Sequence, residues 1–198
     1  MKINKSIIIS LSIIAGIYLL FLILPLILSP ILNAYSKDIS SIVSESSGYK
    51  ITLEKLGIIT TPKLTVGVKI GKIEAKLPTD DVFLTADNVK AKISLLPLVI
   101  GKIEADVISA DSINANLDVR QDGHLLLEEY LPQPDPDKET ETMSSLPLGF
   151  KLSNKLPDIY LKKYNIKFTD MTYKKDYILS GNKFKISDFI LDKKVKLS

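Results

Sequence analysis

Cysteine and tryptophan are absent from the 198-residue sequence, and histidine occurs once, as His124. Without cysteine the chain has no disulfide framework, no thiol nucleophile and no cysteine-ligated zinc. A single imidazole likewise excludes a metal site that needs two. The excess of positive charge is also small, because 26 Lys and Arg are offset by 23 Asp and Glu, which gives a net charge of +3. Nucleic acids require clustered basic side chains, so we expect no nucleic-acid partner.

Sequence motifs for catalysis and metal binding are missing as well. The chain has no glycine-rich phosphate loop and no Gly-x-Ser-x-Gly nucleophile elbow. His124 follows Asp122 in a predicted turn, and we interpret it as a solvated loop residue rather than half of a catalytic pair. The pairs Asp80–Asp81 and Asp135/Asp137 lack the ligand spacing of a calcium loop. We therefore predict no catalytic residue, no metal, no cofactor and no enzymatic activity.

The longest hydrophobic run, from Ile7 to Leu28, contains no charged residue. As an α-helix it would span about 33 Å, close to the hydrocarbon thickness of a bilayer. Lys2 and Lys5 precede it, and basic residues favour the cytoplasmic side. We predict a single-pass membrane protein with residues 1–6 in the cytoplasm, a transmembrane helix over 7–28 and the rest of the chain on the far side. A cleaved secretory signal is the alternative, although its apolar core is usually shorter.

A second helix is predicted over residues 30–47. Ser29 and Pro30 are typical of a helix start, and Gly48 is typical of a helix end. Apolar residues recur in this segment at helical spacing while polar residues fill the other side. We expect this amphipathic helix to pack on the sheet that follows. A position on the membrane surface is the alternative, although such helices are usually rich in Lys and Arg and this one contains only Lys37.

From Tyr49 the hydrophobic period changes from helical to two, which predicts a first β region over 49–131. The alternation reverses its phase at Gly71–Lys72 and again around Asp87–Asn88. Because a one-residue slip turns every later side chain to the other face, we expect a β-bulge at each of these places. The pattern predicts long, bent antiparallel strands with one apolar and one polar face.

Three other segments are not expected to be long strands. The apolar segment 94–101 contains Pro97 and is predicted to form a short turn or helix that either plugs one end of the sheet or dips toward lipid. Residues 125–131 are expected to form a short helix or strand. Residues 132–147 are rich in proline and acidic side chains and are predicted to be a flexible linker.

Alternation resumes in a second β region over 148–198, and its last strand still runs at Ser198. We therefore expect an incomplete architecture with an open C-terminal strand. The alternating apolar positions of the two β regions exceed what one amphipathic helix can cover. An apolar sheet face must be covered by a helix, another sheet or a ligand, and acyl chains are suitable ligands for such a face.

The order of several short motifs resembles the N-terminal part of AsmA-family proteins. After the single N-terminal anchor, the motifs are Pro62-x-Leu64-x-Val66-x-Val68, Ala86-Asp87-Asn88-Val89-x-Ala91-x-Ile93-Ser94-Leu95-Leu96-Pro97-Leu98, Gly101-x-Ile103 and Arg120-x-Asp122-Gly123. The resemblance covers the anchor through about Pro132. It implies an inner-membrane anchor of the Gram-negative type and a periplasmic repeating β-groove, or β-taco, as in TamB-like relatives. It also implies that an apolar groove floor carries phospholipids toward the outer membrane.

We therefore expect an open groove that binds acyl chains, with phospholipid and the inner membrane as partners and a role in envelope lipid homeostasis. The candidate floor residues are Leu64, Val66, Val68, Ile70, Ile73, Val89, Ile93, Ile113 and Leu117. By period-two geometry the first four should share one face. The alternative is a structural or scaffold protein of envelope assembly that carries no lipid and pairs with other envelope proteins through its open C-terminal strand.

Overall fold

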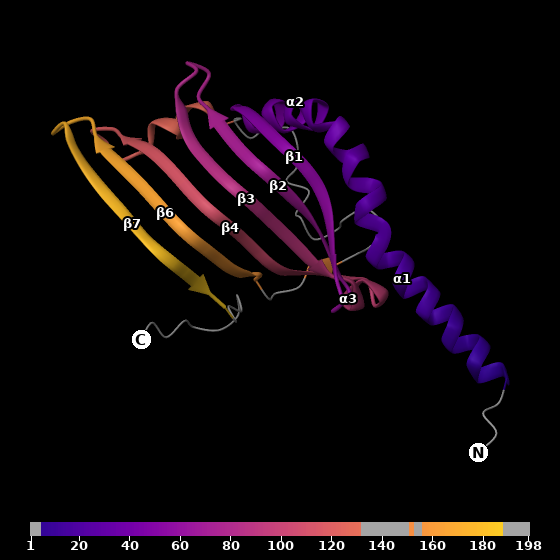
Figure 1. The fold of residues 1–198 in the computed structure, drawn as a ribbon. Helices are drawn as coiled ribbons and strands as arrows, with labels where there is room; N and C mark the ends of the chain where they lie inside the picture. The colour runs from indigo at the N-terminus through magenta and orange to yellow at the C-terminus, as the bar shows by residue number, and fades with distance from the viewer. Residues whose placement is uncertain (1–4, 132–150, 153–155, 188–198) are drawn as a thin grey trace.

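The computed structural model describes residues 5–131, 151–152 and 156–187. Two helices, α1 (Lys5–Ala34) and α2 (Ser36–Ser47), precede a β-sheet. The elements that follow in chain order are β1 (Lys50–Thr61), β2 (Thr65–Lys76), β3 (Val82–Ser94), α3 (Leu95–Val99), β4 (Lys102–Val119), the 3-10 helix η1 (Leu126–Tyr130), β5 (Lys151–Leu152), β6 (Asp158–Asp170) and β7 (Lys175–Ile186). Figure 1 shows the strands as one curved layer, past which the N-terminal part of α1 projects. The predicted mostly β fold with a long apolar helix and a short second helix is confirmed.

The strands form one open sheet in the order β1-β2-β3-β4-β6-β7, with β5 paired to β4. The pairings β1–β2, β2–β3, β3–β4 and β6–β7 are antiparallel as expected, whereas β4 and β6 pair in parallel. A parallel pair needs a long connection because the chain must return to the starting end of the sheet, and residues 120–157 form that connection. The described parts of the two predicted β regions therefore share one sheet. The predicted linker 132–147 lies outside the described residues.

Helix α1 is longer than the predicted transmembrane segment. It continues through Pro25 and Pro30, and the break between the two helices falls at Tyr35 rather than at Ser29–Pro30. A proline inside a helix removes one backbone hydrogen bond, and here that loss does not end α1. By length and composition, the segment Ile8–Ala34 could span a membrane; its most apolar window has a mean hydropathy of 2.8 and no buried residue.

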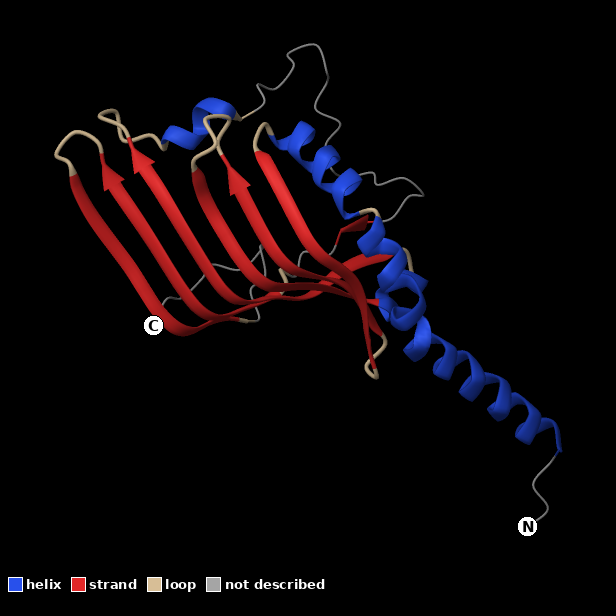
Figure 2. Cartoon of the chain, turned by 45° about the horizontal axis from the view of Figure 1, so that its top comes forward, coloured by secondary structure: helices blue, strands red, loops and turns tan. Residues whose placement is uncertain are grey.

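Both helices lie along the outer edge of β1 (Figure 2). Three serine hydroxyls on α1 and α2 accept hydrogen bonds from N–H groups on that edge: Ser29 from Ile58 at 2.9 Å, Ser40 from Leu53 at 2.9 Å and Ser44 from Ile51 at 2.7 Å. Free N–H groups on an edge strand otherwise invite another strand to pair. The expectation that the second helix packs on the sheet is therefore corrected in one respect. Helix α2 contacts the edge of the sheet, because its serines satisfy the β1 backbone there.

Each of the six long strands reverses its alternation at one residue, and these residues form a line across the sheet that we call the kink row. Its members are Lys55, Gly71, Asn88, Asp111, Lys162 and Lys183. The register is the same on both sides of the row, as the pairs Glu54–Lys72 and Leu56–Ile70 show. The predicted phase reversals at Gly71–Lys72 and Asp87–Asn88 are thus confirmed. The predicted β-bulges at these two places are wrong, because all six strands reverse at the same level and the register does not shift there.

Ser40→Ala tests the contact between α2 and the edge of β1. Ser40 is buried, and its loss leaves the Leu53 N–H without its acceptor. An unsatisfied buried amide costs about 1–3 kcal/mol, which should speed hydrogen exchange at the Leu53 amide by about 5- to 150-fold in the detergent-solubilised protein. Ser46→Ala is the control, because the Ser46 hydroxyl is exposed and donates to the Val43 carbonyl of its own helix. Equal exchange rates in the two variants would contradict the edge contact.

Candidate functional site

The strand registers place the apolar side chains of all six long strands on one side of the sheet, which we call the apolar face. On one side of the kink row, one line of paired residues reads Ile58, Val68, Ala91, Ile108, Ile159 and Ile186. On the other side, a line reads Leu53, Ile73, Ala86, Ile113, Tyr164 and Gly181. Because paired residues on neighbouring strands project to the same face, the apolar face is continuous from β1 to β7.

The opposite side of the sheet is polar. One of its lines of paired residues reads Thr52, Glu74, Thr85, Asn114, Asn165 and Ser180. Glu74 binds Lys76 at 3.0 Å and Lys72 at 3.2 Å. Hydrogen bonds from these two lysines, that from Lys76 first, lower the pKa of the Glu74 carboxyl. Such exposed charge pairs are typical of a face that is in contact with water.

The apolar face is largely uncovered in the part of the chain that the structure describes. The buried residues on it are Leu56 and four alanines, Ala75, Ala86, Ala110 and Ala115. In contrast, Val68 is 42% exposed and Leu179 is 55% exposed. No large side chain among the described residues is fully buried. A sheet with one apolar face normally packs that face against a second layer, and the described helices lie instead at the β1 edge and at the two ends of the strands (Figure 2).

A hollow of about 340 Å³ lies on the apolar face across β1, β2 and β3. Its lining residues are Ile58, Val66, Gly67, Val68, Ala91 and Ile93. None of these side chains carries a hydrogen-bonding group, so the hollow has no means to orient a polar solute. Its chemistry suits a hydrocarbon chain.

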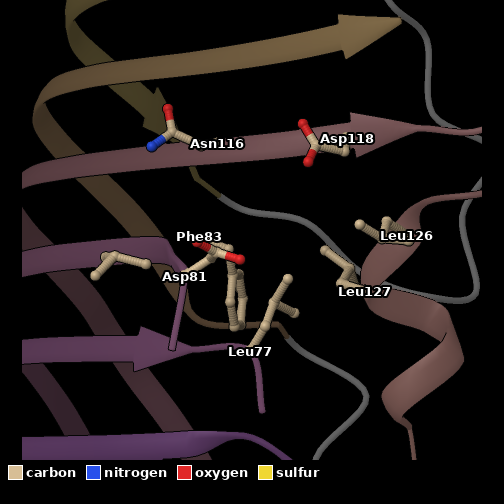
Figure 3. A pocket seen from close by; sticks show the side chains of 8 residues that line it. Leu77, Asp81, Phe83, Asn116, Asp118, Leu126 and Leu127 are labelled. Atoms are coloured by element: carbon tan, nitrogen blue, oxygen red, sulfur yellow. The ribbon is translucent and has the colours of Figure 1, made fainter. Parts of the chain in front are cut away.

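At the opposite end of the strands, η1 packs against the polar face of the sheet. A smaller hollow of about 210 Å³ lies there, and Leu126 and Leu127 of η1 line it together with Phe83 (Figure 3). The ring of Tyr49 packs on Phe83 with centroids 5.0 Å apart, and the Tyr49 hydroxyl donates to the Leu127 carbonyl at 2.7 Å. Burial, with a smaller contribution from the Glu128 carboxylate, raises the pKa of Tyr49. This hydrogen bond fixes η1 over the start of β3.

Most of the predicted floor residues lie together on the apolar face. These are Val66, Val68, Ile70, Ile73, Val89, Ile93, Ile113 and Leu117. Leu64 differs, because β2 begins at Thr65 and Leu64 lies in the preceding turn with a φ of 55°. The prediction missed the contribution of β6 and β7, such as Ile159, Leu179 and Phe184. Their alternation was visible in the sequence, but only the parallel β4–β6 pairing joins them to the same face.

The polar candidates form local contacts. His124 Nδ1 lies 3.0 Å from Glu128 Oε2, and the His124 N–H donates to Asp122 at 3.0 Å. Both interactions stabilise an exposed turn and the start of η1. Asp80 binds Lys50 at 2.7 Å, which lowers the pKa of the Asp80 carboxyl. No group of three potential metal-ligating residues occurs among the described residues, and Asp135 and Asp137 lie outside them.

No family model, curated protein or solved structure matches this chain. The candidate site is therefore defined by its own geometry: a continuous apolar face with an apolar hollow near one end.

Asp111 in the kink row makes the stability of the sheet dependent on pH. Lys162 Nζ and Asn88 Nδ2 each lie 2.7 Å from the Asp111 carboxylate, and these hydrogen bonds, that from Lys162 first, lower the pKa of the carboxyl. A pKa lowered in the folded state adds stability that is present above the unfolded value of about 3.9 and is lost as the pH falls through the folded value. We expect Asp111→Asn to lower the urea midpoint at pH 7 and to change it little near pH 2.

Lys162→Met gives a second measurement of the same interaction. It should reduce the urea midpoint at pH 7 as Asp111→Asn does, and the double variant should be less destabilised than the sum of the two single variants. Full additivity, or equal effects of Asp111→Asn at both pH values, would show that this pair does not act as described.

Proposed function

We propose that this chain is a membrane-anchored protein that holds or passes phospholipid acyl chains on the apolar face of its sheet, without covalent chemistry. The observation that carries this proposal is the uncovered apolar face, which is continuous over six strands. The hollow lined by Val66 and Val68 on this face is lined by apolar atoms alone.

The free energy of hydration favours a hydrocarbon cover for this face. Removing apolar surface from water contributes about 25 cal/mol per Å². Helices α1 and α2 are held at the β1 edge by their serines and so do not supply that cover. A second protein layer would have to satisfy its own backbone N–H and C=O groups, whereas an acyl chain has none. Flexible acyl chains also adapt to a long surface that has no donors or acceptors.

Helix α1 supplies the membrane anchor in this proposal. Lys2 precedes α1 and Lys5 is its first residue, and these basic side chains favour a cytoplasmic N-terminus, with the sheet on the other side of the membrane. The resemblance of the sequence to the AsmA family supports an inner-membrane location, a periplasmic sheet and a role in envelope lipid homeostasis. The polar face of the sheet would then be in contact with the aqueous periplasm.

The edge strand β7 favours a second candidate, a structural or scaffold protein that carries no lipid. Within the described residues β7 pairs with β6 alone, and it exposes Tyr177, Ile178 and Leu179. An exposed apolar edge strand readily pairs with a strand of another chain. Residues 193–198, where the open strand was predicted, lie outside the described residues.

Site-specific photocrosslinking separates the two functions. A photoactivatable residue at Val68 lies in the apolar hollow, whereas one at the neighbouring Lys69 lies on the polar face. In cells, we expect phospholipid adducts at position 68 and none at position 69, as identified by mass spectrometry. Adducts of position 68 to one specific protein, without any lipid adduct, would favour the scaffold and overturn the lipid proposal.

Stability measurements provide an independent test. In a close-packed core Val→Ala leaves a cavity, but a surface in contact with mobile acyl chains refills. We expect Val66→Ala and Val68→Ala to lower the unfolding free energy by less than about 1 kcal/mol with lipid present, and Leu56→Ala to lower it by about 2–5 kcal/mol, because Leu56 is only 7% exposed. Equal losses at Val68 and Leu56 would assign Val68 to a protein core.

A further inference from the structure

The contacts between α1 and the sheet fix where the membrane must lie relative to the strands. Tyr18 Oη donates to the Pro62 carbonyl at 3.2 Å, so Tyr18 is level with the turn between β1 and β2. Further along α1, Ser29 is level with Ile58 of β1. The C-terminal half of α1 therefore runs beside the sheet, and only the residues before Tyr18 project past its end (Figure 1).

The projecting part of α1 is too short to cross a bilayer alone. It runs from Lys5 to Ile17, and at 1.5 Å per residue it spans about 20 Å. The hydrocarbon layer is about 30 Å thick, so about 10 Å more of α1 must also lie in it, as far as about Leu24. Tilting α1 would increase this overlap, because a tilted helix covers less thickness per residue. The end of the sheet beside Tyr18 is consequently level with the hydrocarbon.

The elements at that end have the composition of a membrane-inserted segment. The Leu95 N–H donates to the Leu64 carbonyl at 3.0 Å, which attaches α3 to the β1–β2 turn. Residues 95–101 contain no charge, and Leu96 and Ile100 are 66% and 70% exposed. Thr61 ends β1 and Thr65 begins β2, and their hydroxyl groups form a hydrogen bond of 2.7 Å with each other. These two hydroxyls therefore do not require water as a partner.

Two exposed lysines flank this end of the sheet, Lys63 in the turn and Lys102 at the start of β4. Long basic side chains can keep their stems in hydrocarbon while their ammonium groups reach the phosphate level. Ile93, which lines the apolar hollow, lies only two residues before α3. The hollow is therefore adjacent to the segment that is level with the bilayer.

We propose that α3 and the β1–β2 turn insert into the bilayer beside α1, so that this end of the sheet is embedded in phospholipid hydrocarbon. Leu96 and Ile100 are the inserted side chains, and Lys63 and Lys102 contact the headgroups. This inference goes beyond the acyl-chain function, because it depends on α1 crossing the membrane and on the chemistry of this end, whether or not the apolar face carries lipid.

Spin labelling tests the insertion on the full chain, which is suitable because it contains no cysteine to remove. Single variants Leu96→Cys and Ile100→Cys carry a nitroxide, and the protein is reconstituted into vesicles of phosphatidylethanolamine and phosphatidylglycerol. Leu11→Cys in α1 is the inserted reference. Ile178→Cys is the matched control, because Ile178 on β7 is apolar and 67% exposed but lies far from α3. Collision with a water-soluble nickel chelate and with oxygen is measured at each position.

We expect positions 96 and 100 to lose access to nickel and to gain access to oxygen as position 11 does, while position 178 keeps access to nickel. Nickel access at 96 and 100 equal to that at 178 would overturn the inference, as would nickel access at position 11. Labelling at Lys63→Cys provides a second measurement in case a label on α3 disturbs that helix; position 63 should then be protected relative to position 178. Lipid adducts at Val68 are measured separately, so failure of insertion and failure of acyl-chain binding give different results.

Discussion

Two helices attach to the edge of β1 rather than to a face of the sheet. This attachment determines both the exposure of the apolar face and the position of the sheet relative to a membrane. Serine hydroxyls satisfy the edge N–H groups of Ile51, Leu53 and Ile58. The same contacts prevent another strand from pairing at β1 and hold α1 parallel to the strands. Because α1 and α2 are at the edge, neither of them covers the apolar face. Because α1 is fixed in register with β1, the position of the sheet relative to a membrane follows from the position of α1.

The kink row has a comparable effect on the sheet. A reversal of alternation in one strand alone would place half of its apolar side chains on the polar face, in contact with water. Here six strands reverse together, and left-handed residues at Lys55, Asn88 and Lys183 absorb the change in three of them. Asn88 tolerates this conformation well, whereas lysine is less common there. The result is a sheet that bends at the kink row without losing register there and keeps its apolar face on both sides of the row; the register shifts lie elsewhere, at Ala75/Lys76 and at Lys92/Ile93.

Sequence periodicity predicted the components of this fold better than their arrangement. The reversals at Gly71 and Asn88 were visible because alternation depends on local chain geometry. The helix break at Tyr35 could not be predicted, because Ser29–Pro30 has the residues that are typical of a helix start. The edge position of α2 could not be predicted either, because it depends on hydrogen bonds to a distant strand. The site list was incomplete for the same reason: no local pattern indicates that β6 pairs with β4, which adds Ile159 and its neighbours to the apolar face.

Exposure on the apolar face is higher at the β7 edge of the sheet than at the β1 edge. Leu56 on β1 is 7% exposed, whereas Phe184 and Leu179 on β7 are 41% and 55% exposed. The two strand ends also differ, since η1 packs on the polar face near one of them and the apolar hollow lies toward the other. If α3 is inserted in the bilayer as proposed, acyl chains can reach the hollow lined by Ile93 directly from that end of the sheet. From the hollow the apolar face continues across the strands to β7, which pairs with β6 alone among the described residues, so a strand of another chain that paired with β7 would extend the same apolar surface.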